Sequence, residues 1–221
     1  MPHVYNTRAS WAMVNTGLLA NEPELVRAAR RNLDWALTQQ TPCGWFGTNA
    51  SRPDKVPSTH VIAYAIRGFL ESGLLLAEER YLAAGLLAAF GIARAQRADG
   101  WLAGTYSDGW QPRATYSCLT GLAQMSLNWM RLGQDGGRPR LRENARRAID
   151  NVKRSQRIDT PHDAVRGGIA GSSPIWGAYA RFEYPNWAAK FFVDALMMDM
   201  EGEAITPVAT RFATPIKEIH G

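Results

Sequence analysis

The chain has 221 residues, 46% of them hydrophobic, which is enough for one domain with a sizeable apolar core. Its formal net charge of +5 at pH 7 permits an acidic partner, but no nucleic-acid-binding motif accompanies the basic residues, so we expect no nucleic acid. The two cysteines, Cys43 and Cys118, are too few for a disulfide framework or a zinc cluster, and we expect no metal and no cofactor. No apolar run reaches the length of a membrane span and the first residues lack the features of a signal peptide, which favours a cytoplasmic location.

Seven helical segments follow one another along the chain. They are expected to form one domain over 1–200, followed by an extended tail over 201–221 that contains two prolines. Links after the first, third and fifth helices are short, whereas links after the second, fourth and sixth are long. In chain order, the expected helices are 5–19, 23–40, 59–75, 78–96, 114–131, 141–154 and 185–200.

Two residue types recur at fixed intervals along these helices. Glycines close the first, third and fifth helices, and glutamines close the second, fourth and sixth; both series are spaced by 56 and then 60 residues. A constant period with two helices per unit is typical of stacked helical hairpins, and it places all long loops at one end of the stack. The recurring residues are Gly17, Gly73 and Gly133, and Gln40, Gln96 and Gln156.

The repeated unit of helix, glutamine, glycine and tryptophan resembles the α/α toroids, which include terpenoid cyclases, prenyltransferases and six-hairpin sugar enzymes. The segments 3–8, 59–68, 171–177 and 184–192 resemble prenyltransferase-like bacterial proteins encoded with exopolysaccharide biosynthesis genes. The resemblance implies an all-α fold, either an α/α toroid or an incomplete α/α barrel, and a role in exopolysaccharide metabolism. Members of that family carry about two further hairpins before the segment that matches 3–8, so we expect an incomplete ring here.

A polar face on the third helix is the first candidate for chemistry. His60 lies in the first expected turn, and Tyr64 and Arg67 follow at i+4 and i+7 on the same face. A neutral imidazole there is placed to act as a general base, and Arg8 and Asn186 would complete a set of residue types that polysaccharide lyases on α/α toroids use. The alternative is that His60 only caps or packs at a helix start.

Tryptophans in the long loops are candidates for stacking on sugar rings. Trp45 and Trp101 occupy equivalent repeat positions and are expected to wedge between hairpins. Trp110 and Trp176 break the repeat and are the better ligand candidates. Asp108 is a candidate acid or base for glycoside hydrolysis, or else only a turn residue before glycine.

These features favour a protein that binds an oligosaccharide or polysaccharide on the long-loop face, with glycosidase- or lyase-like activity if it is catalytic. A non-catalytic interaction or scaffold module is the second hypothesis. An enzyme like terpenoid cyclases or prenyltransferases is the third, disfavoured because neither DDxxD nor DxDD occurs. The expected catalytic residues are His60, Tyr64 and Asp108, and the expected substrate-binding residues are Arg8, Arg67, Trp110, Tyr116, Trp176, Asn186 and Trp187.

The two ends of such a stack present apolar helices without obvious polar caps. We therefore expect the chain to form homo-oligomers, or to bind a partner chain that completes the ring.

Overall fold

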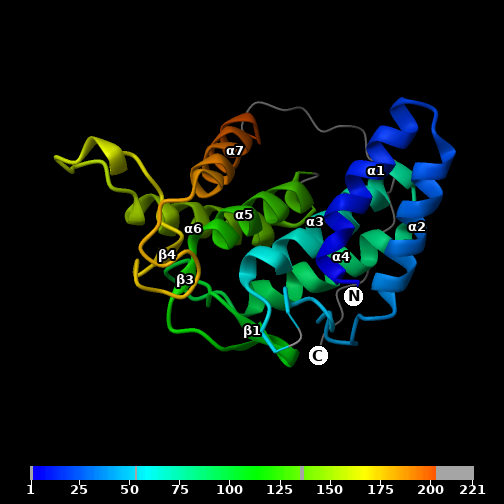
Figure 1. Ribbon diagram of the computed structural model, residues 1–221, viewed down its shortest axis with the longest axis horizontal. Coiled ribbons are helices and arrows are strands. Elements are labelled where there is room, and N and C mark those ends of the chain that lie inside the picture. The colour runs from blue at the N-terminus through cyan, green and yellow to red at the C-terminus, as the bar shows by residue number, and fades with distance from the viewer. Residues whose placement is uncertain (1, 53, 135–136, 203–221) are drawn as a thin grey trace.

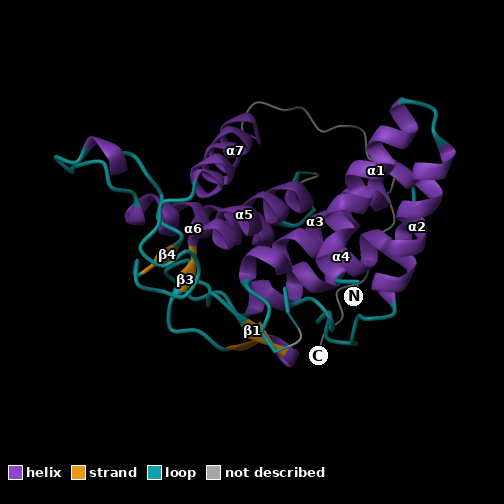
Figure 2. Cartoon of the chain, viewed as in Figure 1, coloured by secondary structure: helices purple, strands orange, loops and turns teal. Residues whose placement is uncertain are grey.

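The computed structural model describes residues 2–52, 54–134 and 137–202, which form seven α-helices in two rows (Figures 1 and 2). Helices of the inner row pack against one another in chain order, and each outer helix packs mainly against the inner helix that precedes it. The prediction of an all-α chain with about seven main helices is confirmed. The inner row is α1 (Thr7–Leu19), α3 (Thr59–Leu76), α5 (Leu119–Gly133) and α7 (Asn186–Gly202), and the outer row is α2 (Pro23–Leu37), α4 (Glu79–Arg94) and α6 (Pro139–Ser155).

The recurring glycines lie where each inner helix turns back into its outer partner. The carbonyl of Gly17 accepts a hydrogen bond from the amide of Glu22 at 2.8 Å, and the carbonyl of Gly73 accepts the same bond from Glu78 at 2.9 Å. A Cβ on Gly73 would lie 2.7 Å from the side chain of Leu82 in the paired helix. Glycine therefore allows the two helices of each hairpin to approach closely just before the turn.

Two of the recurring glutamines, Gln40 and Gln96, connect one hairpin to the next, whereas Gln156 donates to the carbonyl of Gly167 in its own loop. Nε2 of Gln40 donates to the carbonyl oxygen of Ala84 at 2.9 Å, and Nε2 of Gln96 donates to the carbonyl oxygen of Asn144 at 3.0 Å. The turns that follow Gln40 and Gln96 each contain a glycine with positive φ, Gly44 at +83° and Gly100 at +84°, pressed against the next outer helix. The sequence period thus corresponds to a repeated polar contact between neighbouring hairpins.

The long loops meet at one end of the stack, as the repeat predicts. Ser58 in the first loop forms a β-bridge with Thr105 in the second, and β3 (Ser117–Cys118) in the second pairs with β4 (Ser172–Ser173) in the third. Because of this pairing, α5 begins at Leu119, five residues after residue 114, where the sequence predicted the helix to begin. The remaining short elements are η1 (Val4–Asn6), β1 (Tyr106–Ser107), η2 (Asp108–Trp110), β2 (Gln111–Pro112) and η3 (Asp163–Val165).

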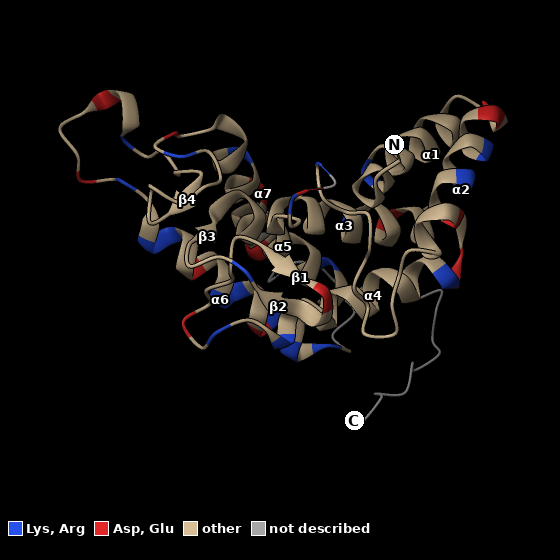
Figure 3. Ribbon diagram, turned by 60° about the horizontal axis from the view of Figure 1, so that its bottom comes forward, with Lys and Arg blue, Asp and Glu red and all other residues tan. Residues whose placement is uncertain are grey.

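The core lies between the two rows, where α3 and α5 are buried on several faces. Basic residues gather over the outer helices α2 and α6 (Figure 3). On α7, the side chains of Val193, Met197 and Met200 are 51%, 53% and 74% exposed.

None of the helices in the described part of the chain is both long and apolar enough to cross a membrane. The expected tail begins within α7, and its residues 203–221 lie outside the described residues.

Candidate functional site

The N-terminal halves of α1 and α3 bring a basic and aromatic cluster together. The ring of His60 lies 4.4 Å from that of Tyr64, and the guanidinium of Arg8 lies 5.4 Å from the Tyr64 ring. The two helices touch because Gly68 lies against Thr7, where an added Cβ would be 2.3 Å from the carbonyl carbon. Arg8, His60 and Tyr64 therefore lie together, and Gly68 permits this close approach of the two helices.

His60 is fixed from α5. Nε2 of Gln124 lies 2.7 Å from Nδ1 of His60, and Gly121 leaves room for this approach, since its Cβ would fall 2.6 Å from the His60 amide nitrogen. Burial and, secondarily, the charge of Arg8 lower the pKa of His60 to about 4. The imidazole is therefore neutral at pH 7. With Nδ1 accepting from the Gln124 amide, the ring proton lies on Nε2. In this arrangement His60 has a hydrogen-bond donor at Nε2 and is a weak base.

A third segment, the loop before α7, adds an aromatic residue that the sequence analysis missed. The ring of Tyr179 lies 5.6 Å from that of His60, and its hydroxyl accepts a hydrogen bond from the indole nitrogen of Trp187 at 3.1 Å. Burial raises the pKa of Tyr179 to about 12, so its hydroxyl keeps its proton. Trp187, 47% exposed, joins the His60 cluster through this contact. No spacing in the sequence singles out Tyr179 among the aromatic residues of its loop.

Deeper on α3, a charged network continues the cluster. Glu71, only 8% exposed, lies 2.9 Å from Arg67 and 3.2 Å from Arg131 of α5. Arg67 and Arg8 also lie over the ring of Trp11, at 5.6 and 4.5 Å. Burial lowers the pKa values of both Arg8 and Arg67, but arginine remains charged at neutral pH.

The balance of this network is positive, because three arginines face one glutamate. Nε of Arg67 is buried without a hydrogen-bond partner. The carboxylate of Asp194 on α7 acts electrostatically on both Arg8 and Arg67 and forms an exposed ion pair with Lys190. Trp11, Glu71, Gln124 and Arg131 were not predicted. For Trp11, Glu71 and Gln124 the signal was a spacing of i+3 or i+4 from Arg8, Arg67 and Gly121, which becomes informative only once the helices are known to face one another.

Two other predicted residues, Asp108 and Trp110, lie in η2, and Trp110 packs against the outer helix α4. Trp110 is 7% exposed, donates from its indole nitrogen to the carbonyl of Cys43 at 2.8 Å, and packs against Gly91. A carboxylate oxygen of Asp108 accepts a hydrogen bond from the amide of Gly109 at 2.8 Å, as in a turn. Trp110 therefore wedges between elements in the manner that the sequence predicted for Trp45 and Trp101.

The last three predicted residues lie in or next to the loop that precedes α7. Trp176 is 62% exposed, and Asn186 is exposed at the first position of the helix. Tyr116 is half-buried and packs against Gly104 and Gly177, so it joins two loops. Within the described residues, no group of three or more His, Cys, Asp or Glu side chains is arranged to hold a metal ion.

No protein-family model and no curated protein sequence matches the chain. Solved structures do match. A glycosyl hydrolase of family 88 from Bacteroides vulgatus aligns with a TM-score of 0.70 at 15% identity, over 91% of this chain and 63% of that protein. An unsaturated glucuronyl hydrolase from Bacillus sp. GL1, described as responsible for degrading glycosaminoglycan, aligns with a TM-score of 0.71 at 15% identity, over 90% and 59%. A polysaccharide lyase aligns with a TM-score of 0.68 at 13% identity, over 92% and 63%.

The chain has the α/α toroid fold. It spans about three fifths of the length of these neighbours. At such identities the likeness shows the fold alone.

Proposed function

We propose that this toroid handles acidic saccharides in exopolysaccharide biosynthesis or processing, and that its ligand binds at the Arg8–His60–Tyr64 cluster. The observation that carries the proposal is the pair of arginines, Arg8 and Arg67, whose guanidinium groups both lie over the ring of Trp11. Guanidinium groups bind carboxylates through charge-assisted hydrogen bonds, and aromatic faces bind the apolar faces of sugar rings. The structural neighbours are carbohydrate-processing enzymes, which supports the saccharide assignment.

The hydrogen-bonding groups around the arginines also fit a sugar. His60 offers a donor from Nε2, and Tyr179 offers a hydroxyl whose proton is retained at neutral pH. Sugar hydroxyls donate and accept, so they can bind both groups. In a cleavage reaction, Arg8 and Arg67 would neutralise the uronate, and a tyrosine hydroxyl would give its proton to the leaving glycosidic oxygen as the C–O bond breaks. The tyrosine would regain a proton from the attacking water in hydrolysis, or from the carbon next to the carboxylate in elimination.

The non-catalytic alternative is favoured by one observation. The pKa of His60, about 4, makes the imidazole a weak base, and its Nδ1 is already engaged by Gln124. A site with this histidine is better suited to binding than to proton abstraction. Binding and turnover should therefore be measured separately.

The test is calorimetric titration with an acidic tetrasaccharide and with the same tetrasaccharide after its carboxylates are reduced to alcohols. We expect saturable binding of the acidic form only. Arg8→Ala should weaken it by about tenfold to a hundredfold, the range expected for a hydrogen bond to a charged group. The matched control is Arg140→Ala on α6, an exposed arginine of the outer row. Equal binding by wild type and Arg8→Ala would remove the site from this cluster.

Turnover is followed in the same samples by release of reducing ends and by the ultraviolet absorbance of an unsaturated uronate. Reducing ends alone indicate hydrolysis, both signals indicate a lyase, and binding without either signal selects the non-catalytic alternative.

A further inference from the structure

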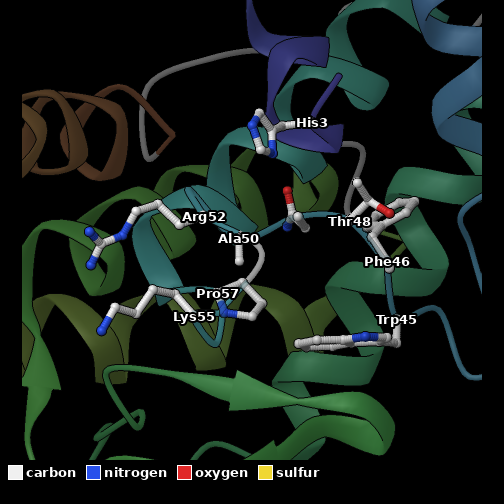
Figure 4. Close-up of a pocket in the computed structure, with 10 residues that line it drawn as sticks. His3, Trp45, Phe46, Thr48, Ala50, Arg52, Lys55 and Pro57 are labelled. Atoms are coloured by element: carbon white, nitrogen blue, oxygen red, sulfur yellow. The ribbon is translucent and has the colours of Figure 1, made fainter. Parts of the chain in front are cut away.

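A separate pocket of about 300 Å³ lies between η1 and the loop that follows α2 (Figure 4). Trp45 and Phe46 form one side, His3 lies on the opposite side, and the side chains of Arg52 and Lys55 extend together away from both. This volume is at the lower end of the range for small-molecule sites. It is sufficient for one sugar ring.

The walls of the pocket are fixed before any ligand arrives. Backbone hydrogen bonds tie the Thr48 carbonyl to the Val4 amide at 3.1 Å and the Gly47 amide to the Gln39 carbonyl at 2.9 Å. Phe46 stacks on Phe69 of α3 with ring centroids 5.2 Å apart. Such a preformed wall reduces the conformational entropy that the protein loses when a ligand binds.

The loop also holds a strained residue. Thr48 has a φ of +48°, in the left-handed region that β-branched residues seldom adopt. Strained backbone of this kind concentrates at ligand-binding and catalytic sites. Here it turns the chain so that the next residue, Asn49, lines the pocket.

Two polar atoms of the pocket lining lack partners. Oδ1 of Asn49, a residue only 3% exposed, is buried without a hydrogen bond, and so is Nδ1 of His3. Nearly all buried polar atoms in folded proteins are hydrogen-bonded, and two of the exceptions among the described residues belong to residues that line this cavity. A hydroxyl-bearing ring would supply donors to Asn49 and an apolar face to Trp45.

The charged residues at the mouth of the pocket favour one class of ligand. Asp54 lies 3.7 Å from Arg52 and 3.9 Å from Lys55, so one carboxylate is shared by two cations. The mouth therefore keeps an excess positive charge that favours a ring with a carboxylate.

Two short segments of the chain lead from the pocket to residues of the candidate site. Pro57 in its wall precedes His60 by three residues, and η1 leads directly into the helix that carries Arg8. We propose that this pocket is a second subsite, which binds a further uronate unit of the same acidic oligosaccharide. The proposal rests on the saccharide function of the His60 cluster and extends it from one sugar unit to a longer chain.

The subsite is tested by the dependence of affinity on chain length. The wild type should bind an acidic tetrasaccharide at least tenfold more tightly than the matching disaccharide. Asn49→Ala should abolish this difference without changing the affinity for the disaccharide. Arg52→Ala, at an exposed position that folding does not need, should reduce the difference several-fold, and Arg140→Ala should leave it unchanged. Thermal midpoints verify that each variant is folded.

A second measurement locates the binding directly. In ¹H–¹⁵N spectra, the tetrasaccharide should shift the backbone amides of Gly47 and Asn49, and the disaccharide should shift only signals near His60. Equal affinity for the two lengths, or a length effect that survives both variants, would overturn the second subsite while the saccharide function stands. Absence of binding to either glycan by the wild type would overturn the saccharide function and the subsite with it.

Discussion

The side-chain amide of Gln124 on α5 lies 2.7 Å from Nδ1 of His60 on α3, and joins two inner helices across 64 positions of sequence. This contact holds the imidazole beside Arg8 and away from bulk water. Both effects disfavour the charged form of the ring, which is why its pKa falls to about 4.

We predict that His60 makes folding sensitive to mild acid. In the unfolded chain histidine binds a proton below about pH 6.5, whereas folded His60 does so only below about pH 4. Between these values the unfolded state holds more protons, so the free energy of unfolding falls as pH decreases from 7 to 4, by up to about 3 kcal/mol. Urea unfolding at a series of pH values measures this slope. His60→Gln should lose this part of the slope, and exposed His162→Gln should keep it.

The glutamine ties between hairpins should contribute directly to stability. Gln40→Ala removes the side-chain donor to the carbonyl of Ala84, and Gln96→Ala removes the side-chain donor to the carbonyl of Asn144. We expect each change to lower the free energy of unfolding by about 1–3 kcal/mol. Gln111→Ala, at an exposed position, should cost less than about 0.5 kcal/mol. If denaturant unfolding finds all three variants alike, the repeat glutamines have no structural role.

Gly68 should not tolerate a side chain. Gly68→Ala places a Cβ 2.3 Å from the Thr7 carbonyl carbon, and a backbone atom of α1 cannot move aside without shifting the helix. We expect a loss of about 3 kcal/mol or more, together with weaker glycan binding, because α1 carries Arg8. The control is Gly47→Ala, whose Cβ would lie 3.7 Å from its nearest neighbour and should change stability by less than about 1 kcal/mol. Thermal unfolding compares the stability of the two variants, and calorimetry compares the glycan affinity of Gly68→Ala with that of the wild type.

The Glu71 carboxylate should stabilise the fold by balancing two arginines. Glu71→Gln removes the charge that Arg67 and Arg131 share, at a residue that is 8% exposed. A loss of roughly 3 kcal/mol is expected, since a buried charge without its partner is costly. The exposed pair of Asp150 and Lys153 provides the control, and Asp150→Asn should change stability by less than about 0.5 kcal/mol. A smaller effect at Glu71 than at Asp150 would contradict the importance of the buried network.

Self-association remains a prediction from the open ends of the stack. The exposed apolar residues of α7, among them Val193 and Met197, favour a contact with a second chain. Light scattering at micromolar concentration should detect a dimer or larger species, and Met197→Glu should dissociate it. Ile158→Glu is the control, because this residue is 62% exposed in the loop before α7. A monomeric wild type would argue against the prediction.

The sequence by itself determined the helical hairpins, their order and the end at which the long loops gather. These features depend on local signals, such as Gly17 and Gly73 at helix ends and Gln40 and Gln96 before the turns, which recur because each unit repeats the same short-range packing. The helix starts were predicted least well where a distant segment intervened, as at α5, where pairing with β4 moved the start to Leu119.

The sequence alone predicted only the part of the candidate site that lies on one helix. His60, Tyr64 and Arg67 share a face of α3 by their spacing alone, and Arg8 joined them through a resemblance. The tertiary structure alone decided that Gln124 fixes His60, that Tyr179 lies against it, and that Trp110 is buried while Trp176 is exposed. Each of these facts depends on contacts between segments far apart in sequence. Helical periodicity specifies which residues share a face, but the packing of whole helices and loops decides what that face meets.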